Sequence, residues 1–159
     1  FWLPKGHDVW VKGGRKLAEF LVDIPYEDRN VIAHSHGGQV VAYAARMMHY
    51  RGERIRSVVT HDSPIRHDME GVWRAAERAI DQHIHHYGTG WGSRMRWLGQ
   101  RGRLKRIFPA PAKNVPVPGG HSGGLRNPKY FSLWYPTLRS IETSISHVAP
   151  ETAPIQDNL

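Results

Sequence analysis

The sequence predicts a protein of the α/β class, with a small, mostly parallel sheet flanked by helices. Short β-branched runs alternate with amphipathic segments of about 10 to 14 residues, which is typical of parallel βαβ units. Gly and Pro residues separate these segments. Because right-handed crossovers bring the carboxyl ends of parallel strands to one edge, we expect a functional site at that edge.

The first three predicted elements follow one another closely. Residues 13–22 have the apolar spacing of an amphipathic helix, which we expect to end before Pro25. Residues 30–35 contain a brief apolar run that favours a buried strand. Residues 37–50 resume a helical period, and Gly52 lies just beyond the expected end of this helix.

The remaining elements are predicted from weaker patterns. We expect a strand over 57–60, a helix over 69–80 and a strand over 82–87. Gly and Pro are frequent from residue 88 onward, so the segment 88–118 is predicted to be an irregular basic insertion. Residues 130–146 have the pattern of one or two terminal helices.

Length and composition predict one globular domain. The chain has 159 residues, of which we assign 1–147 to the domain and 148–159 to a loose tail. It begins with Phe1 rather than Met, so we expect it to be part of a longer protein or the product of processing. The absence of cysteine excludes disulfides, thiolate metal sites and a cysteine nucleophile. No apolar run approaches the roughly 18 residues that a transmembrane helix needs.

The chain is strongly basic, with Lys and Arg exceeding Asp and Glu by eight. Much of the excess lies between Arg94 and Arg106, close to Trp91 and Trp97. This stretch is expected either to be a solvated surface or to bind an anionic surface or a nucleic acid. The composition does not determine compartment or oligomeric state, and a soluble cytoplasmic protein is the default expectation.

The residues around Ser35 predict a nucleophile elbow. The sequence Ala33-His34-Ser35-His36-Gly37 places a serine between a strand and a helix, with small residues two positions before and after it. Small residues at those positions allow the strand and the helix to approach closely around the nucleophile. The backbone N–H of His36 would then stabilise an oxyanion together with the positive end of the helix.

Three segments resemble lipases and esterases of the α/β-hydrolase fold. The run NVIAHSHGGQVVAYA at 30–44 resembles their nucleophile segment, and SVVTHDSPIR at 57–66 is similar to the strand that follows it. The run GGHSG at 119–123 resembles the loop that carries the catalytic histidine. The resemblance implies a three-layer sandwich of helices and sheet, with His121 as the general base for Ser35.

The catalytic acid is the member of the triad that the sequence identifies least directly. In the family it usually follows the next strand, but residues 88–93 contain no carboxylate. Some members take it from the preceding strand end, and this implies Asp62 here. The alternative role of Asp62 is to form the turn before Pro64. Asp68 and Glu70 are weaker candidates for the acid, and a serine–histidine dyad without an acid is a further alternative. The loop that usually supplies a second oxyanion donor has no clear counterpart in the short segment before residue 13.

The resulting hypothesis is ester hydrolysis through an acyl-enzyme on Ser35, with a small-molecule ester or lipid as substrate and no cofactor or metal. One alternative is a catalytically inactive hydrolase-like domain that serves as a basic binding module. Another is a metallohydrolase, because histidines are spaced like metal ligands. These histidines are equally consistent with ordinary packing, and they are His34, His36, His61, His83, His85 and His86.

Overall fold

The computed structural model describes residues 5–89, 104–105, 108 and 110–119. The chain divides into two compact units, Phe1–His121 and Ser122–Leu159, and all described residues belong to the first. The domain expected from the sequence extended to residue 147. Among the described residues, no helix combines the length and apolarity that a membrane span requires.

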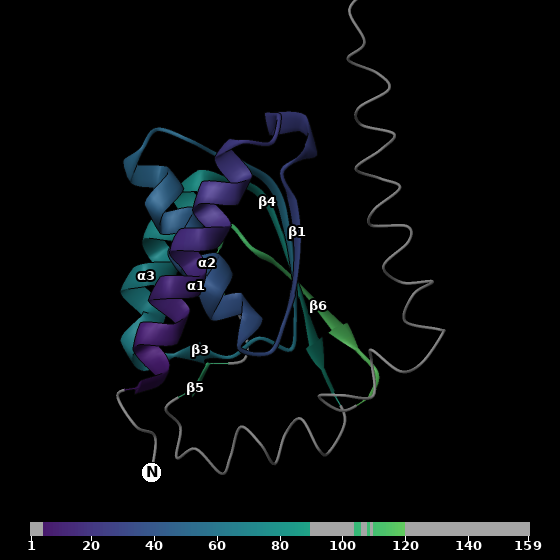
Figure 1. The fold of residues 1–159 in the computed structure, drawn as a ribbon. Coiled ribbons are helices and arrows are strands. Elements are labelled where there is room, and N and C mark those ends of the chain that lie inside the picture. The colour runs from purple at the N-terminus through teal and green to yellow at the C-terminus, as the bar shows by residue number, and fades with distance from the viewer. Residues whose placement is uncertain (1–4, 90–103, 106–107, 109, 120–159) are drawn as a thin grey trace, which may run out of the picture. The chain divides into compact units, whose positions relative to one another are not determined.

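The described residues of the first unit contain a four-stranded parallel sheet, which lies to one side of the helices (Figure 1). Its strand order is β1-β2-β4-β6, and each neighbouring pair is parallel. This arrangement confirms the predicted α/β class and the mostly parallel sheet. Strands β3 and β5 form a separate two-stranded antiparallel sheet. The strands are β1 (Asn30–His34), β2 (Ile55–His61), β3 (Ile65–Arg66), β4 (Ile80–Gly88), β5 (Leu104–Lys105) and β6 (Lys113–Val117).

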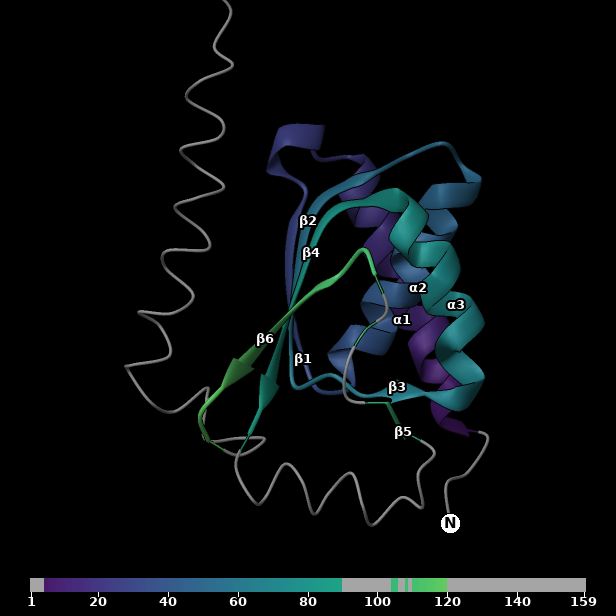
Figure 2. The same cartoon turned by 180° about the vertical axis from the view of Figure 1, so that it is seen from behind.

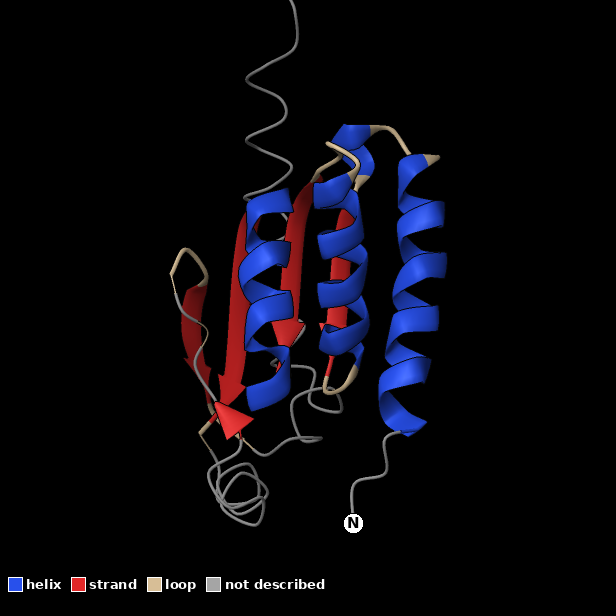
Figure 3. Ribbon diagram, turned by 90° about the vertical axis from the view of Figure 1, so that its left-hand side faces the viewer, coloured by secondary structure: helices blue, strands red, loops and turns tan. Residues whose placement is uncertain are grey.

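Three α-helices pack on one face of this sheet. They are α1 (Lys5–Val22), α2 (Gly37–Tyr50) and α3 (Glu70–Ala76). Figure 3 shows the three helices in front of the strands, and Figure 2 shows from behind that all of them lie on the same side. Short 3₁₀ turns, η1 (Tyr26–Asp28), η2 (His67–Met69) and η3 (Glu77–Ala79), complete the connections. The described residues therefore supply the sheet and one layer of α-helices.

Two helices differ from their predicted ranges. Helix α1 begins at Lys5 rather than at residue 13, because Trp10 and Gly14 continue the buried face that Ala18 and Leu21 form further along. The helix predicted over 69–80 is shorter in the structure. Helix α3 ends at Ala76 and is followed by the 3₁₀ turn η3.

Strand β6 was not predicted, since Lys113–Val117 lies within the segment 88–118 that was assigned to an irregular insertion. It pairs with β4 alone among the described strands. Pro116 within it removes one backbone donor, which an edge strand tolerates better than a central one. The same proline weakens the sequence signal for a strand.

Two glycines bring α2 close to its neighbours. A Cβ atom on Gly14 of α1 would lie 2.4 Å from the Cβ atom of Tyr43 on α2. A Cβ atom on Gly38, in the first turn of α2, would lie 2.6 Å from Ser63 Oγ. Because protein interiors are close-packed, neither site has room for a larger residue without movement of the backbone. Gly38 therefore fixes how the start of α2 meets the turn after β2.

We predict that Gly38→Ala lowers the free energy of unfolding by about 1 to 3 kcal/mol, because the added methyl group overlaps Ser63. Gly71→Ala in α3 is the matched control, since among the described residues a Cβ atom added there would meet nothing within 4 Å beyond the local backbone of its own helix. That change is expected to raise stability by about 0.5 to 1 kcal/mol. Urea denaturation measures the free energy of unfolding of both variants. Equal changes in this free energy for the two variants would contradict the prediction.

Candidate functional site

Ser35 occupies the turn between β1 and α2 at the carboxyl edge of the sheet. Its backbone N–H donates to the carbonyl oxygen of His61 at 3.0 Å. Its own carbonyl oxygen accepts a hydrogen bond from Gly38 N–H at 3.2 Å. These two bonds tie the turn to β2 on one side and to the first turn of α2 on the other.

The backbone of Ser35 is in the left-handed region, with φ of 53°. This conformation costs about 1 to 2 kcal/mol for a residue with a side chain, so it persists only where the surrounding structure imposes it. Asp62, with φ of 44°, is the other non-glycine residue with positive φ in the described part of the chain. A serine in a strained strand-to-helix turn is the backbone feature that a nucleophile elbow requires.

The residues two before and two after Ser35 make the tight turn possible. A Cβ atom added to Gly37 would lie 3.7 Å from the Cβ atom of Ala33, which is an ordinary contact. Side chains larger than methyl at both positions would separate the strand from the helix. Alanine in place of the more usual glycine at position 33 is therefore compatible with the turn.

The N-terminus of α2 lies directly beside Ser35. His36 precedes the first residue of the helix and has helical backbone angles, with φ of −66° and ψ of −13°. The N–H groups in the first turn of a helix point out of its end and carry the positive pole of the helix dipole. This end of α2 is therefore suited to stabilise negative charge that develops next to Ser35.

Asp62 lies next to Ser35 along the sheet edge. The register pairs His34 with His61, so Ser35 and Asp62 occupy the following positions on adjacent strands. Asp62 is completely buried, and its carboxylate accepts a hydrogen bond from Gly88 N–H at 3.3 Å. Its backbone N–H donates to the carbonyl oxygen of His86 at 2.7 Å. The sheet thus places Asp62 next to Ser35 in register, and its carboxylate reaches toward the end of β4.

The remaining predicted functional residues are described only in part or not at all. His121 lies outside the described residues, so its distance from Ser35 is not defined. Of the basic stretch from Arg94 to Arg106, the structure describes the backbone of Leu104 and Lys105 in β5. The described structure brings together Ser35, Asp62 and the start of α2.

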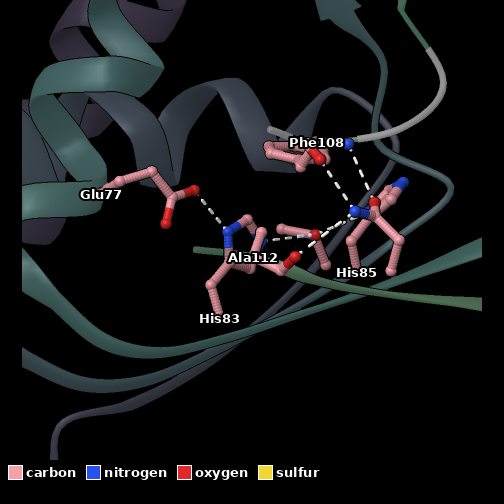
Figure 4. A network of polar contacts seen from close by, with 7 residues as sticks. Glu77, His83, His85, Phe108 and Ala112 are labelled. Carbon is pink, nitrogen blue, oxygen red and sulfur yellow. Dashed lines mark hydrogen bonds and ion pairs between the residues drawn. The ribbon is translucent and has the colours of Figure 1, made fainter. Parts of the chain in front are cut away.

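A second group of polar side chains is buried between the sheet and α3 (Figure 4). Glu77 Oε1 lies 2.6 Å from His83 Nδ1. The hydroxyl of Thr60 lies 2.9 Å from His83 Nε2 and 2.8 Å from His85 Nδ1. The indole of Trp73 stacks on His83, with ring centroids 5.5 Å apart, and Phe108 packs edge-on against both rings.

This network gives His83 and His85 a packing role. Their side chains point to the helical side of the sheet, where Thr60 joins them. The described residues contain no group of three His, Asp or Glu side chains positioned to hold a metal ion. The sequence indicated the two histidines but not Glu77 or Thr60. The alternation of His83 and His85 along a strand was the available signal, since it places both side chains on one face.

Three other histidines form a row on the opposite face of the sheet. His34, His61 and His86 occupy one register position across β1, β2 and β4. The ring centroids of His34 and His61 are 5.8 Å apart, and those of His61 and His86 are 6.3 Å apart. Burial lowers the pKa of His86 below its ordinary value, because desolvation disfavours the charged imidazolium.

Comparison of the chain with models of protein families, with curated proteins and with solved structures found no match in any of the three. The geometry of the site is therefore the observation that bears on function. That geometry places a serine hydroxyl group, a helix N-terminus and a buried carboxylate at one edge of the sheet.

We predict that Thr60→Val lowers the free energy of unfolding by about 2 to 4 kcal/mol, because two buried imidazole nitrogens lose their shared partner. Thr60→Ser keeps the hydroxyl and loses only a methyl group, so its expected loss is about 1 kcal/mol. Chemical denaturation of both variants measures the difference. A Thr60→Val variant as stable as Thr60→Ser would contradict the structural role of the network.

We predict that the stability of the protein falls as the pH drops below about 6.5, with His86 as one cause. Because the pKa of His86 is lowered in the folded state, the unfolded chain binds a proton at a higher pH than the folded chain does. Above pH 6.5 both states are mainly neutral at this residue, and the effect is absent. His86→Gln should therefore make the loss of stability between pH 7.5 and 5.5 smaller, as measured by urea midpoints. An unchanged loss would show that His86 does not contribute.

Proposed function

We propose that this protein is a serine hydrolase of the α/β-hydrolase type that cleaves esters through an acyl-enzyme on Ser35. The observation that carries the proposal is the left-handed backbone of Ser35, with φ of 53°, between a parallel strand and the start of a helix. Backbone strain of this kind persists at sites where a side chain must be presented in one direction.

In the first step, Ser35 Oγ attacks the carbonyl carbon of the ester, and the hydroxyl proton passes to a general base. We assign this role to His121, since a neutral imidazole accepts a proton near neutral pH. The carbon–oxygen bond to the alcohol then breaks, and the imidazolium returns the proton to the departing alcohol. The products of this half-reaction are the free alcohol and an ester between the acyl group and Ser35.

Negative charge develops on the carbonyl oxygen during this attack. The backbone N–H of His36, at the start of α2, is the donor best placed to stabilise it. The positive pole of α2 acts in the same direction. Removal of one oxyanion donor typically lowers the rate by a factor of about 10² to 10³, so a single donor supports measurable but reduced turnover.

In the second step, a water molecule gives a proton to His121 and attacks the acyl carbon. The bond between that carbon and Ser35 Oγ then breaks, and the imidazolium returns its proton to Oγ, which releases the acid and restores Ser35. Asp62 is our assignment for the carboxylate that orients His121. Its burial and its hydrogen bond from Gly88 N–H support this role, because a fixed carboxylate stabilises one imidazole tautomer and the imidazolium.

The proposal includes the hydrolase-like three-layer arrangement, in which helices cover both faces of the sheet. A parallel sheet is normally covered on both faces, because its strands are apolar on both sides. Ile32 of β1 supports this arrangement, since it lies on the sheet face opposite α1, α2 and α3 and is 48% exposed. The described residues account for one of the two helical layers.

We predict that a fluorophosphonate probe labels the full chain once, on Ser35, and that Ser35→Gly abolishes the label. Glycine removes the nucleophile and also relieves the positive φ, so this variant should be at least as stable as the original protein. Labelling is measured by intact mass and by peptide mapping.

Ser63→Ala is the matched control for this experiment. Ser63 is a neighbouring serine, buried and with no hydrogen-bond partner for its hydroxyl in the described part of the chain. Its removal should leave labelling unchanged. Absence of label on folded protein, or a label that survives Ser35→Gly, would refute the proposal.

A further inference from the structure

The side chain that follows Ser35 is held against α1. The imidazole of His36 stacks on the indole of Trp10, with ring centroids 5.6 Å apart and an angle of 12° between the planes. Trp10 is 7% exposed, although it belongs to the first half of a surface helix. Nearly parallel aromatic rings at this distance attract one another beyond the burial of their area.

Trp10 is itself held in place by its other neighbours. The Cζ atom of Arg66, in β3, lies 5.2 Å from the centre of the Trp10 ring, within the range of a cation–π interaction. Arg66 is oriented by two hydrogen bonds to Asp68, of 2.8 and 2.6 Å. Helix α1 approaches α2 closely at Gly14, one turn after Trp10. The indole is therefore a fixed surface for His36.

His36 needs such a surface because of its position. Within the described part of the chain, no side-chain hydrogen bond caps the N-terminus of α2. The His36 N–H belongs to the same planar peptide group as the Ser35 carbonyl, which accepts a hydrogen bond from Gly38 N–H at 3.2 Å. The direction of this N–H therefore depends on that bond, on the strained turn at Ser35 and on the contacts that hold the His36 side chain. A ring stacked on a buried indole restricts rotation of the His36 side chain and anchors the residue on α1.

We infer that Trp10 is a positioning residue for the oxyanion hole, because its stack with the His36 ring holds the His36 backbone N–H toward the carbonyl oxygen of the substrate. The inference rests on the proposed function. Trp10 touches no reacting atom in this mechanism and acts only through His36. Its loss should therefore slow the covalent step without weakening the initial binding of a reagent.

The test measures the maximal rate of covalent labelling by a fluorophosphonate and, separately, the reagent concentration at half that rate. Trp10→Leu and His36→Ala should each lower the maximal rate about tenfold and leave the half-saturating concentration unchanged. Trp10→Phe and His36→Phe keep a ring for stacking, so they should stay within about threefold of the original rate. The double variant Trp10→Leu/His36→Ala should be no slower than the slower single variant, because both changes remove the same interaction, the stack between the two rings.

Met48→Ala provides the control for general destabilisation. Met48 is fully buried near the other end of α2, so this variant should be less stable but should label at the original rate. The inference is overturned if Met48→Ala slows labelling as much as Trp10→Leu does, or if the effects of Trp10→Leu and His36→Ala multiply. It is also overturned if His36→Phe is as slow as His36→Ala, since the imidazole itself would then take part.

A second readout separates this inference from the proposed function. The ring current of Trp10 should shift the NMR signals of the His36 imidazole, and Trp10→Leu should abolish that shift. If the original protein shows the shift but no labelling of Ser35, the proposed function fails, and the positioning role fails with it. If Ser35 is labelled at the same rate in the original protein and in the Trp10→Leu variant, only the positioning role fails.

Discussion

The left-handed backbone at Ser35 is the constraint on which the geometry of the site depends. An L-residue adopts φ of 53° only when the chain on both sides is fixed. Here β1 is paired with β2 up to His34, and α2 begins at Gly37, with only Ser35 and His36 between them. The turn between them is short, and its backbone is fixed at Ser35 N–H and at the Ser35 carbonyl oxygen by hydrogen bonds to His61 and Gly38.

Other features of the fold preserve this turn. Gly38 lets the first turn of α2 rest on Ser63, and Gln39 Nε2 donates to the carbonyl oxygen of Pro64. Asp62, the residue that follows β2, also has a positive φ, so a left-handed residue comes directly after each of the two strands. Both turns lie at the carboxyl edge of the sheet. Close packing around them supplies the rigidity that a preorganised site requires.

The elements on either side of Ser35 were predicted well because their signals are local. The range of α2 matches the predicted 37–50, since its helical period and the glycine after it lie within one stretch of sequence. Strand β6 was missed because its pairing with β4 depends on a distant segment and Pro116 disrupts its pattern. Trp10 was missed for a similar reason, as only the contact with His36 gives it a role.

The histidines illustrate the same limit of sequence reasoning. Their spacing alone did not distinguish a metal site from packing. The packing role of His83 and His85 is visible only in the structure, where the hydroxyl of Thr60 from β2 lies within hydrogen-bond distance of both rings and Glu77 from η3 contacts His83. These partners come from separate segments, so only the tertiary structure reveals them. His121 remains a prediction from resemblance, because it lies outside the described residues.

The most direct test of the proposed mechanism is to trap the acyl-enzyme that it requires. The full chain would be mixed with an excess of p-nitrophenyl acetate, quenched in acid within the first turnover and mapped by peptide mass spectrometry. Because p-nitrophenolate is a good leaving group, we expect acylation to be faster than deacylation, so the mechanism predicts a burst of about one p-nitrophenolate per chain and one acetyl group on Ser35. Release of p-nitrophenolate with no burst and no acetyl group on Ser35, or with the acetyl group on another residue, would contradict it.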